Sequence, residues 1–503
     1  MTSSSIESTN RPSAHLTKTR FASGDQCVLR LYNDVYHRCH AKQPNESTKA
    51  KFELGTQVGE LARQRYPDGV LVGHEPWERA AALADTERLI ADPRVPAIFE
   101  AAIEHEGVFV RVDLLVRQQD GWELVEVKSS TNLDKPQYRL DVAIQYWVLT
   151  GAGLRVVRAG ILGLDRAYVY PGGDYDPQAL FRFSDETEHC LAVHAELDER
   201  VAAFHTVLAS NDAPVVSVGD HCFSPYECPY YEHCSAGIAF PEDTIKDLPS
   251  FRGRRREALV TLGVDFIRDI PPDFELTEMQ ERVRQAVVSG KSWQSPDLGR
   301  ALATAQKPIY YLDFEAWSPP LPYYQGTRPY QALPFQYSLH VENGKAESDH
   351  YEYLHEERSD PRRALAERLF EHLGDSGSIV VYTGYEQTTL NGLVRDLPDL
   401  AGPLMALVDR LWDLHPVIRD HYYHPGFRGS FSIKDVLPAL LPGEGWANLE
   451  ISGGGDAGFK YQEGLFTKDM AVRRKNFGDL REYCKQDTLA MLRVMQELRR
   501  LCC

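Results

Sequence analysis

The chain has 503 residues, of which 43% are hydrophobic and 25% are charged. This length predicts roughly two to four domains at about 150 residues each, and the ordinary composition excludes collagen-like, wholly disordered and coiled-coil proteins. Acidic residues number 73 and basic residues 55, so the net charge is −18, which disfavours sequence-independent binding of a polyanion. Carboxylates that hold divalent cations create local positive charge, so nucleic acid stays among the candidate partners.

The start of the chain and its cysteines bear on the compartment. Residues 1–20 are rich in Ser and Thr and lack an apolar stretch, so we expect a disordered tail and not a secretory signal. No apolar run approaches the length of about 18 residues that a membrane helix needs, and we expect no membrane partner. We therefore expect a cytoplasmic protein, in which nine cysteines indicate metal or cluster ligands before disulfides.

We expect three regions along the chain, with boundaries near residues 240 and 300. Residues 21–240 mix strand and helix patterns, and residues 241–300 are helical without a clear strand. Residues 301–503 begin with a strand at 309–314 and end in a long amphipathic helix. Strands and helices that alternate in this way predict an α/β fold class.

A predicted hairpin in the first region carries two acids and a lysine. Residues 108–116 and 122–128 are typical of two strands joined by a turn at 118–121. Two registers are open, which place Asp113 opposite Glu126 or opposite Lys128, and in both Glu126 and Lys128 share one face. Two carboxylates on an apolar hairpin suit Mg²⁺ or Mn²⁺, whereas the alternative is an exposed, ion-paired face.

A predicted helix at 141–147 adds Gln145 to this pattern. Asp113, then Glu126-Val127-Lys128, then Gln145 resembles the PD-(D/E)xK nucleases of the RecB type. The resemblance implies a restriction-endonuclease-like domain at 21–240 that cuts DNA. It also implies metal binding by Asp113, Glu126 and the carbonyl of Val127, with Lys128 and Gln145 as further catalytic residues. The upstream histidine of those enzymes is replaced here by Gly59, and Glu60 is a candidate substitute.

Three cysteines recur at equal spacing near the end of the first region. Cys222, Cys228 and Cys234 have five residues between successive members, in a stretch rich in turn-forming and aromatic residues. Three thiolates leave a four-coordinate site incomplete, so a fourth ligand is needed for zinc or for an iron–sulfur cluster. Five intervening residues are less typical of zinc, and the remaining alternative is three unrelated thiols.

RecB-type nucleases that carry a cluster, including CRISPR-associated and AddB-like ones, supply one cysteine near the N-terminus and three after the nuclease core. By that resemblance Cys27 is the fourth ligand. The cofactor that the resemblance implies is a [4Fe–4S] cluster, with zinc as the alternative, and it joins the two ends of the nuclease domain.

A second group of acids brackets the third region. Asp313 and Glu315 lie two residues apart on a predicted strand, so both point to one face. Tyr483 and Asp487 lie four residues apart on a predicted helix and share a face with apolar residues, which indicates that this face is buried. Such acids can hold two Mg²⁺ ions roughly 4 Å apart, a geometry suited to phosphodiester hydrolysis.

This second pattern resembles the DnaQ-like DEDD exonucleases, which have an RNase H-like fold. In those enzymes an Asp-x-Glu strand opens the domain and a Tyr-x-x-x-Asp helix closes it. The resemblance implies that Glu386 stands where the middle acid is usually Asp, with Asp413 as a rival. An inactive domain with a salt-bridged strand and helix is the alternative. Together the two patterns resemble an uncharacterised bacterial family of fused RecB-like and DnaQ-like proteins.

The middle region carries the strongest basic cluster. Four arginines fall within residues 252–256, ahead of a helix, a Leu-Gly-Val turn and a second expected helix. This outline is typical of a helix-hairpin-helix linker that offers backbone amides to phosphate, and the alternative is a helical spacer with a solvated charge run.

The sequence therefore predicts a divalent-metal-dependent nuclease that acts on DNA or also on RNA, with one RecB-like and one 3′-5′ exonuclease-like site. The alternative is a nucleic-acid-binding or assembly protein in which one or both sites are inactive. The departures at Gly59 and Glu386 favour that alternative.

Overall fold

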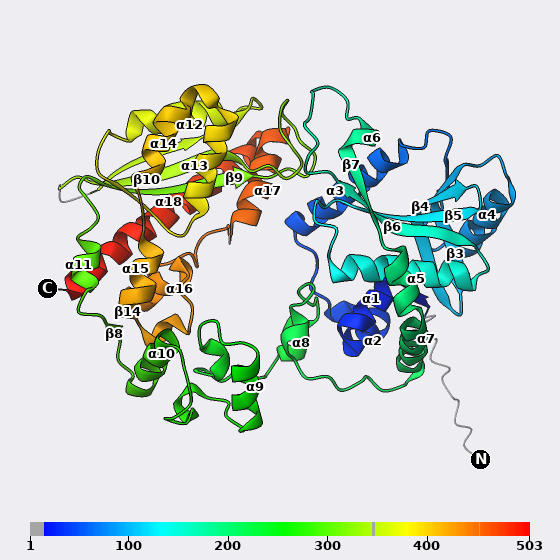
Figure 1. Cartoon of the computed structure of the whole chain (residues 1–503), viewed down its shortest axis with the longest axis horizontal. Helices are drawn as coiled ribbons and strands as arrows, with labels where there is room; N and C mark the ends of the chain where they lie inside the picture. The colour runs from blue at the N-terminus through cyan, green and yellow to red at the C-terminus, as the bar shows by residue number, and fades with distance from the viewer. Residues whose placement is uncertain (1–14, 345–347, 452, 503) are drawn as a thin grey trace, which may run out of the picture. The chain divides into compact units, whose positions relative to one another are not determined.

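The computed structural model describes residues 15–344, 348–451 and 453–502, which form a mixed α/β chain of two compact units (Figure 1). Unit 1 contains the residues up to Ile238 together with Pro319–Gln331. Unit 2 contains Ala239–Ser318 and the residues from Ala332 onward. The helical segment 241–300, which we expected as a linker of its own, thus belongs to unit 2, and a short segment of the expected third region belongs to unit 1.

Unit 1 is built on one sheet in the order β2-β3-β4-β5-β6-β7, with β1 beside β4. The strands are β1 Leu16–Thr17, β2 Val70–Leu71, β3 Ala97–His105, β4 Val108–Gln118, β5 Gly121–Lys128, β6 Val156–Leu164 and β7 Phe181–Asp185. The helices are α1 Lys18–Gln26, α2 Val28–Tyr36, α3 Glu46–Arg63, α4 Arg79–Ala91, α5 Pro136–Gly151, α6 Pro177–Leu180, α7 Thr187–Ala209 and α8 Tyr231–Ser235.

The β4–β5 hairpin settles the register that the sequence left open. Leu114 pairs with Val125 and Gln118 with Gly121, so the turn centres on Gln119 and Asp120 and the ladder runs toward Asp113 and Glu126. Both predicted strands and the helix that carries Gln145 are therefore confirmed.

One edge of β4 pairs with β3 along most of its length, and the other edge has two partners whose division places the site. The second half of β4 pairs antiparallel with β5, whereas its first residues pair in parallel with β1 through Leu16 and Val108. Because β1 runs with β4 and β5 runs against it, the ends of β1 and β5 approach each other beside Asp113. Residues 16–20 were expected in a disordered tail; that expectation is wrong, since they form β1 and the first turn of α1. The rest of that tail, residues 1–14, lies outside the described residues.

Two hydrophobic clusters cover the sheet of unit 1. The larger one joins β3, β4 and β5 to α5 and α7, and it contains Trp147 and Leu149 of α5. A smaller cluster packs Val58 and Ala62 of α3 against Leu114 and neighbouring strand residues. Helix α5 is buried continuously from Val142 to Leu149, so a polar residue such as Gln145 needs a polar partner there.

Unit 2 is built on a sheet in the order β11-β10-β9-β12-β13, and a two-stranded sheet pairs β14 with β8. The strands are β8 Trp293–Gln294, β9 Ile309–Trp317, β10 Leu333–Glu342, β11 Asp349–Leu354, β12 Ser378–Val381, β13 Leu411–Asp413 and β14 Tyr422–Tyr423. The helices are α9 Arg254–Thr261, α10 Glu278–Ser289, α11 Leu298–Leu302, α12 Pro361–His372, α13 Tyr385–Asp396, α14 Ala401–Val408, α15 Leu414–His421, α16 Ile433–Leu440, α17 Gly454–Phe466 and α18 Met470–Leu501.

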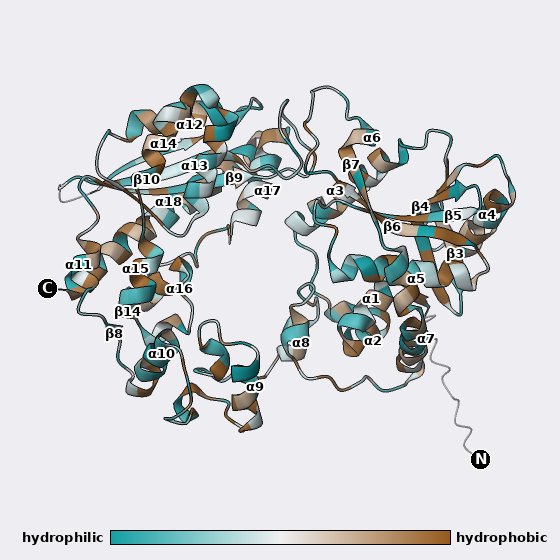
Figure 2. Ribbon diagram, viewed as in Figure 1, coloured by the Kyte–Doolittle hydropathy of each residue, from teal (hydrophilic) through white to brown (hydrophobic). Residues whose placement is uncertain are grey.

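Alternate residues of β9 face two different layers. Leu312 and Phe314 pack with helices α12, α13 and α14, whereas Tyr311 packs on the other face with α18 (Figure 1). Helices such as α12 mix hydrophilic and hydrophobic residues, as expected where one side covers a sheet (Figure 2). Asp313 and Glu315 have the parity of Tyr311, and the fold therefore turns both acids toward α18.

The middle segment differs from its expectation in two respects. Residues 293–294 form β8, although the sequence suggested no strand between 241 and 300. After the turn at Gly263 the chain makes only a single 3₁₀ turn, Ile267–Asp269, so the second helix of a helix-hairpin-helix is absent at the place we expected it. The segment packs into the core of unit 2 instead, through residues such as Leu259 and Val283.

Across the described ranges, no helix is long and apolar enough to cross a membrane.

Candidate active sites

Glu126 is the centre of the first site, which comprises Asp113, Glu126, Lys128 and Gln145. Its side chain is almost fully buried. Lys128 Nζ donates to Glu126 Oε1 at 2.9 Å, and Gln145 Nε2 donates to Glu126 Oε2 at 2.7 Å. The structure thus brings the second strand and helix α5 together at one carboxylate, and Glu126 is the polar partner that Gln145 requires.

Lys18 is a member of the first site that the sequence analysis missed. Its ammonium donates to both oxygens of Glu126, at 2.7 and 2.9 Å. Thr17 caps the helix that begins at Lys18, and β1 holds this start against β4. A Thr cap before a helix was the local signal; its position beside Asp113 depends on a long-range strand pairing that a single sequence does not reveal.

Asp113 is anchored by the backbone of the facing strand, because Val127 N–H donates to Asp113 Oδ2 at 2.7 Å. Burial and the charge of Glu126 raise the pKa of Asp113 to about 7. Burial alone would raise the pKa of Glu126 as well, but the ammonium groups of Lys128 and Lys18 lower it below its ordinary value.

Lys128 has a second acidic partner. Its Nζ donates to Asp141 Oδ2 at 2.5 Å, so Lys128 bridges two carboxylates from β5 and α5. Asp141 was seen only as the start of a predicted helix. On α3, by contrast, Glu60 is exposed and a side chain added at Gly59 would meet open space. The ion pair between α3 and the sheet comes from a different residue, Arg63, which contacts Glu100 of β3 at 2.7 Å.

The cysteine loop closes onto the start of the chain. Gln26 Nε2, directly before Cys27, donates to the carbonyls of His221 and Tyr226 at 2.7 Å each. Within the loop, Cys228 N–H donates to the Cys222 carbonyl at 2.7 Å. These contacts gather Cys27, Cys222, Cys228 and Cys234.

The four thiols influence one another electrostatically. Burial raises the pKa of Cys228 and of Cys234, and the neighbouring sulfurs of Cys27 and Cys222 raise both further. Cys27, Cys222, Cys228 and Cys234 are thus close enough in space to act on one another's charge.

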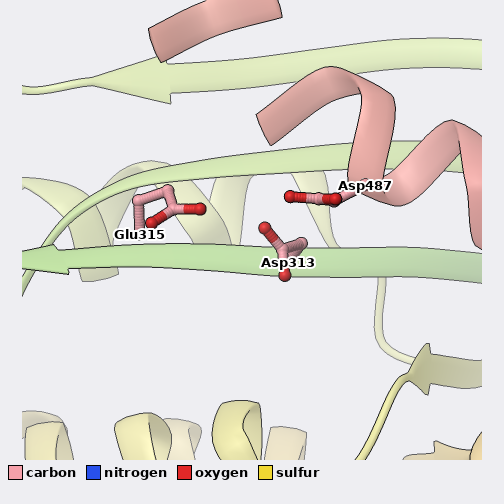
Figure 3. Close-up of side chains that lie close together, drawn as sticks. All are labelled: Asp313, Glu315 and Asp487. Carbon is pink, nitrogen blue, oxygen red and sulfur yellow. The ribbon is translucent and has the colours of Figure 1, made fainter. Parts of the chain in front are cut away.

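The second site comprises Asp313, Glu315, Glu386, Tyr483 and Asp487. Asp313 and Glu315 project from β9 toward Asp487 on α18 (Figure 3). One oxygen from each of these three carboxylates lies within 4.8 Å of the others. Of the residues the structure describes, these form the one group of three or more potential ligands packed so closely. A strand and a helix that are far apart in sequence thus build an acidic cage of the size of a cation.

Burial first, and repulsion between carboxylates second, set the electrostatics of this cage. Burial and the charge of Asp487 raise the pKa of Glu315 to about 8, and the same two causes raise that of Asp313 well above its ordinary value. Burial also raises the pKa of Asp487 to about 6. Acids held this way bind protons more tightly than free carboxylic acids do.

Glu386 lies at the edge of the cage and not inside the group of three. It is almost fully buried in the first turn of α13, and its Oε2 has no hydrogen-bond partner. Burial raises its pKa to about 8, and Asp313 is close enough for a side-chain hydrogen bond. Asp413, the rival acid, accepts from the N–H groups of Thr383 and His415 and caps α15, so it has a structural partner.

Two further residues of the second site were missed by the sequence analysis. Trp446 Nε1 donates to Asp487 Oδ1 at 2.8 Å. Lys434 Nζ donates to the Tyr483 hydroxyl at 3.2 Å. Both come from the stretch after residue 432, where no motif marks them, and only the tertiary fold brings them to α18.

One stretch of the chain matches a known protein family. Residues 310–432 match a family described as a domain of unknown function, DUF2779. The match begins on β9 and ends just before α16, so it includes Asp313, Glu315 and Glu386 but not Tyr483 or Asp487. No curated protein matches the chain.

Proposed function

We propose that the chain is a divalent-metal-dependent nuclease that hydrolyses phosphodiester bonds of DNA, or of RNA as well. The observation that carries the proposal is the cage of Asp313, Glu315 and Asp487, whose oxygens lie within 4.8 Å of one another. Glu315 is buried and Asp313 and Asp487 are half-buried, and bringing three such carboxylates together without a cation is costly.

Strand order supports a DnaQ-like, RNase H-like assignment for unit 2. Numbered along the chain from β9, the sheet has the order 3-2-1-4-5, with β10 antiparallel and β12 parallel to β9. The first strand carries the paired acids and the last helix carries Tyr483 and Asp487.

The order of the site residues supports a RecB-like, restriction-endonuclease-like assignment for unit 1. Asp113 lies on one strand, Glu126 and Lys128 lie on the next, and Gln145 lies on the following helix.

The donor set fits Mg²⁺ or Mn²⁺, which take carboxylate oxygens. In the second site Asp313, Glu315 and Asp487 would hold the metal, and the orphaned oxygen of Glu386 offers a further ligand. In the first site Asp113, Glu126 and the Val127 carbonyl would do so. Bound metal would activate water and stabilise charge on the phosphoryl group. The protein's own part is to fix the acids and to position Tyr483 over Asp487.

For the cysteine site we propose a [4Fe–4S] cluster held by Cys27, Cys222, Cys228 and Cys234, with zinc as the alternative. Four cysteines brought together by the fold fit the four-thiolate ligand set of such a cluster. Iron and sulfide analysis of anaerobically purified protein tests the assignment. A colourless protein with one equivalent of zinc would reverse it.

The decisive experiment measures degradation of 5′-labelled and 3′-labelled single-stranded and duplex DNA with Mg²⁺ or Mn²⁺. Asp313→Asn disables the second site and Asp113→Asn the first, and each substitution keeps the side-chain shape. Asp399→Asn, an exposed acid of unit 2 paired with Arg363, is the matched control. Activity that survives in a double variant, Asp113→Asn with Asp313→Asn, would contradict the proposal.

One observation favours a second candidate for the first site alone. The ammonium of Lys18 contacts both oxygens of Glu126, the acid that would bind metal. A site whose metal position is taken by a lysine would bind nucleic acid without cutting it. This candidate predicts that Asp113→Asn leaves the Mg²⁺-dependent activity of the whole chain unchanged.

A further inference from the structure

The side chain of Lys434 places a positively charged ammonium group beside the acids of the second site. The charge of its side chain opposes the increase in pKa of both Glu315 and Asp487, two acids on different elements. It lies in the first turn of α16, whose start is fixed by Ser432 accepting from the Lys434 N–H. A short capped helix thus presents one ammonium to an otherwise acidic centre.

Two aromatic rings hold this ammonium in place. The nitrogen lies 5.1 Å from the ring centre of Tyr483 and 5.8 Å from that of Trp446. Both aromatic residues also contact Asp487, through the indole N–H of Trp446 and the hydroxyl of Tyr483. Because each ring binds both Lys434 and the acid, the lysine has a defined position next to the cage.

The direction of the hydrogen bond between Lys434 and Tyr483 is fixed by chemistry. An ammonium only donates, so the Tyr483 oxygen accepts from Lys434. The Tyr483 hydroxyl also lowers the pKa of Asp487, so it lies beside that acid. Lys434 therefore places a positive charge at the end of this group of residues.

The balance of charges at the second site suggests what the ammonium of Lys434 does. Two divalent cations would balance the four carboxylates of the second site, and a phosphodiester then adds one negative charge without a partner. Hydrolysis increases the need for positive charge, because the phosphorus gains a bond to the water oxygen while the bond to the leaving oxygen breaks. The water proton ends on that leaving oxygen. A fixed cation at the phosphoryl group stabilises this charge in the transition state.

We propose that Lys434 contacts a non-bridging oxygen of the scissile phosphodiester and is a catalytic residue of the second site. The inference rests on the proposed nuclease function and adds a substrate-contacting residue to it. Lys434 lies outside the stretch that matches the domain of unknown function, because that match ends at residue 432.

The test is a double-mutant cycle between Lys434→Met and Tyr483→Phe, read as kcat/KM on a labelled single-stranded oligonucleotide. A direct phosphate contact predicts a loss of about 100-fold from Lys434→Met in both backgrounds, with Lys434→Arg retaining part of the activity. If Lys434 only positions the Tyr483 hydroxyl, Lys434→Met will cost nothing further in the Tyr483→Phe background, and the proposal is overturned.

Two controls keep the result interpretable. Lys475→Met removes an exposed lysine of α18 that pairs with Asp479, and it should leave kcat/KM within about twofold. Calorimetric titration with Mn²⁺ checks that Lys434→Met still folds its acidic site, and metal should bind at least as tightly once the nearby positive charge is gone.

A binding measurement separates this proposal from the proposed function. With Ca²⁺ in place of Mg²⁺, affinity for the same oligonucleotide should fall about tenfold in Lys434→Met. A wild-type chain that binds but does not cleave would refute the nuclease function while this difference still supported the phosphate contact. Equal affinity of wild type and variant, together with equal kcat/KM, would refute the contact itself.

Discussion

The two acidic sites solve the problem of buried negative charge in opposite ways. In the first, Lys18 and Lys128 neutralise Glu126 directly, and the pKa of that acid lies below its ordinary value. In the second, Asp313 and Glu315 face Asp487 with one lysine nearby, and the pKa values of all three acids are raised. Two ammonium groups thus offset the charge of Glu126 in the first site, although the pKa of Asp113 there is raised, whereas all three acids of the cage in the second site have raised pKa values.

This difference predicts which of the two sites should bind a divalent metal more tightly. A carboxylate already paired with two ammonium groups gains little from a divalent ion, because the ion must displace them. Carboxylates that repel one another are stabilised much more by such an ion. We therefore expect metal to bind first and most tightly in unit 2.

The largest effect should come from Asp313→Asn. Removing one of the three close acids of the cage should lower Mg²⁺-dependent cleavage about 1000-fold, since metal ligation supplies several kcal/mol of transition-state stabilisation. Asp113→Asn should have a smaller effect in the same assay. The comparison between the sites would be reversed if Asp113→Asn proved the more damaging of the two.

Lys18→Met should destabilise unit 1 by about 3 kcal/mol, because it leaves a buried carboxylate with one of its two lysine partners gone. Denaturant unfolding followed by tryptophan fluorescence measures this. Lys49→Met, which removes an exposed lysine paired with Glu46, should cost less than about 1 kcal/mol. Equal effects of the two substitutions would show that the Lys18 pair is not a structural element of the site.

The metal-free chain should lose stability as the pH rises through the second site's titration. Glu315 and Glu386 have ordinary pKa values of 4.5 and folded values of about 8, so between these limits the folded state binds more protons than the unfolded state. The free energy of unfolding therefore falls with rising pH over this window. Thermal melting from pH 5 to 8 tests this, and Mg²⁺ should flatten the slope. A slope that is unaltered in Glu315→Gln would contradict the assignment.

The smallest effect should come from Glu386→Asp. Shortening the side chain by one methylene withdraws its carboxylate from Asp313, and cleavage should fall about tenfold. Glu386→Gln, which keeps the length but removes the charge, should cost more. Equal or higher activity in Glu386→Asp would place Glu386 outside the metal site.

Local pattern predicted much of what positions the sites. Period-two alternation located β4 and β5, and their turn residues restricted Asp113 to two possible partners. Helical spacing placed Tyr483 and Asp487 on one buried face of α18, and Leu480 and Met491 on that face are indeed buried. These features depend on neighbours close in sequence, which a single sequence records.

The residues that escaped prediction depend on distant pairings. Lys18 reaches Glu126 only because β1 pairs with the start of β4, and Lys434 reaches Tyr483 only because α16 packs beside α18. The segment Pro319–Gln331 follows β9 of unit 2 but packs in unit 1, where Thr327 O accepts from Tyr170 N–H at 2.9 Å. No local periodicity encodes such contacts.

Calorimetric titration with Mn²⁺ tests the central contrast most directly, using the wild-type chain, Asp313→Asn and Asp113→Asn at pH 8. We expect Asp313→Asn to abolish the tightest Mn²⁺-binding event and Asp113→Asn to leave that event in place. Tight binding that persists in Asp313→Asn and vanishes in Asp113→Asn would contradict this expectation.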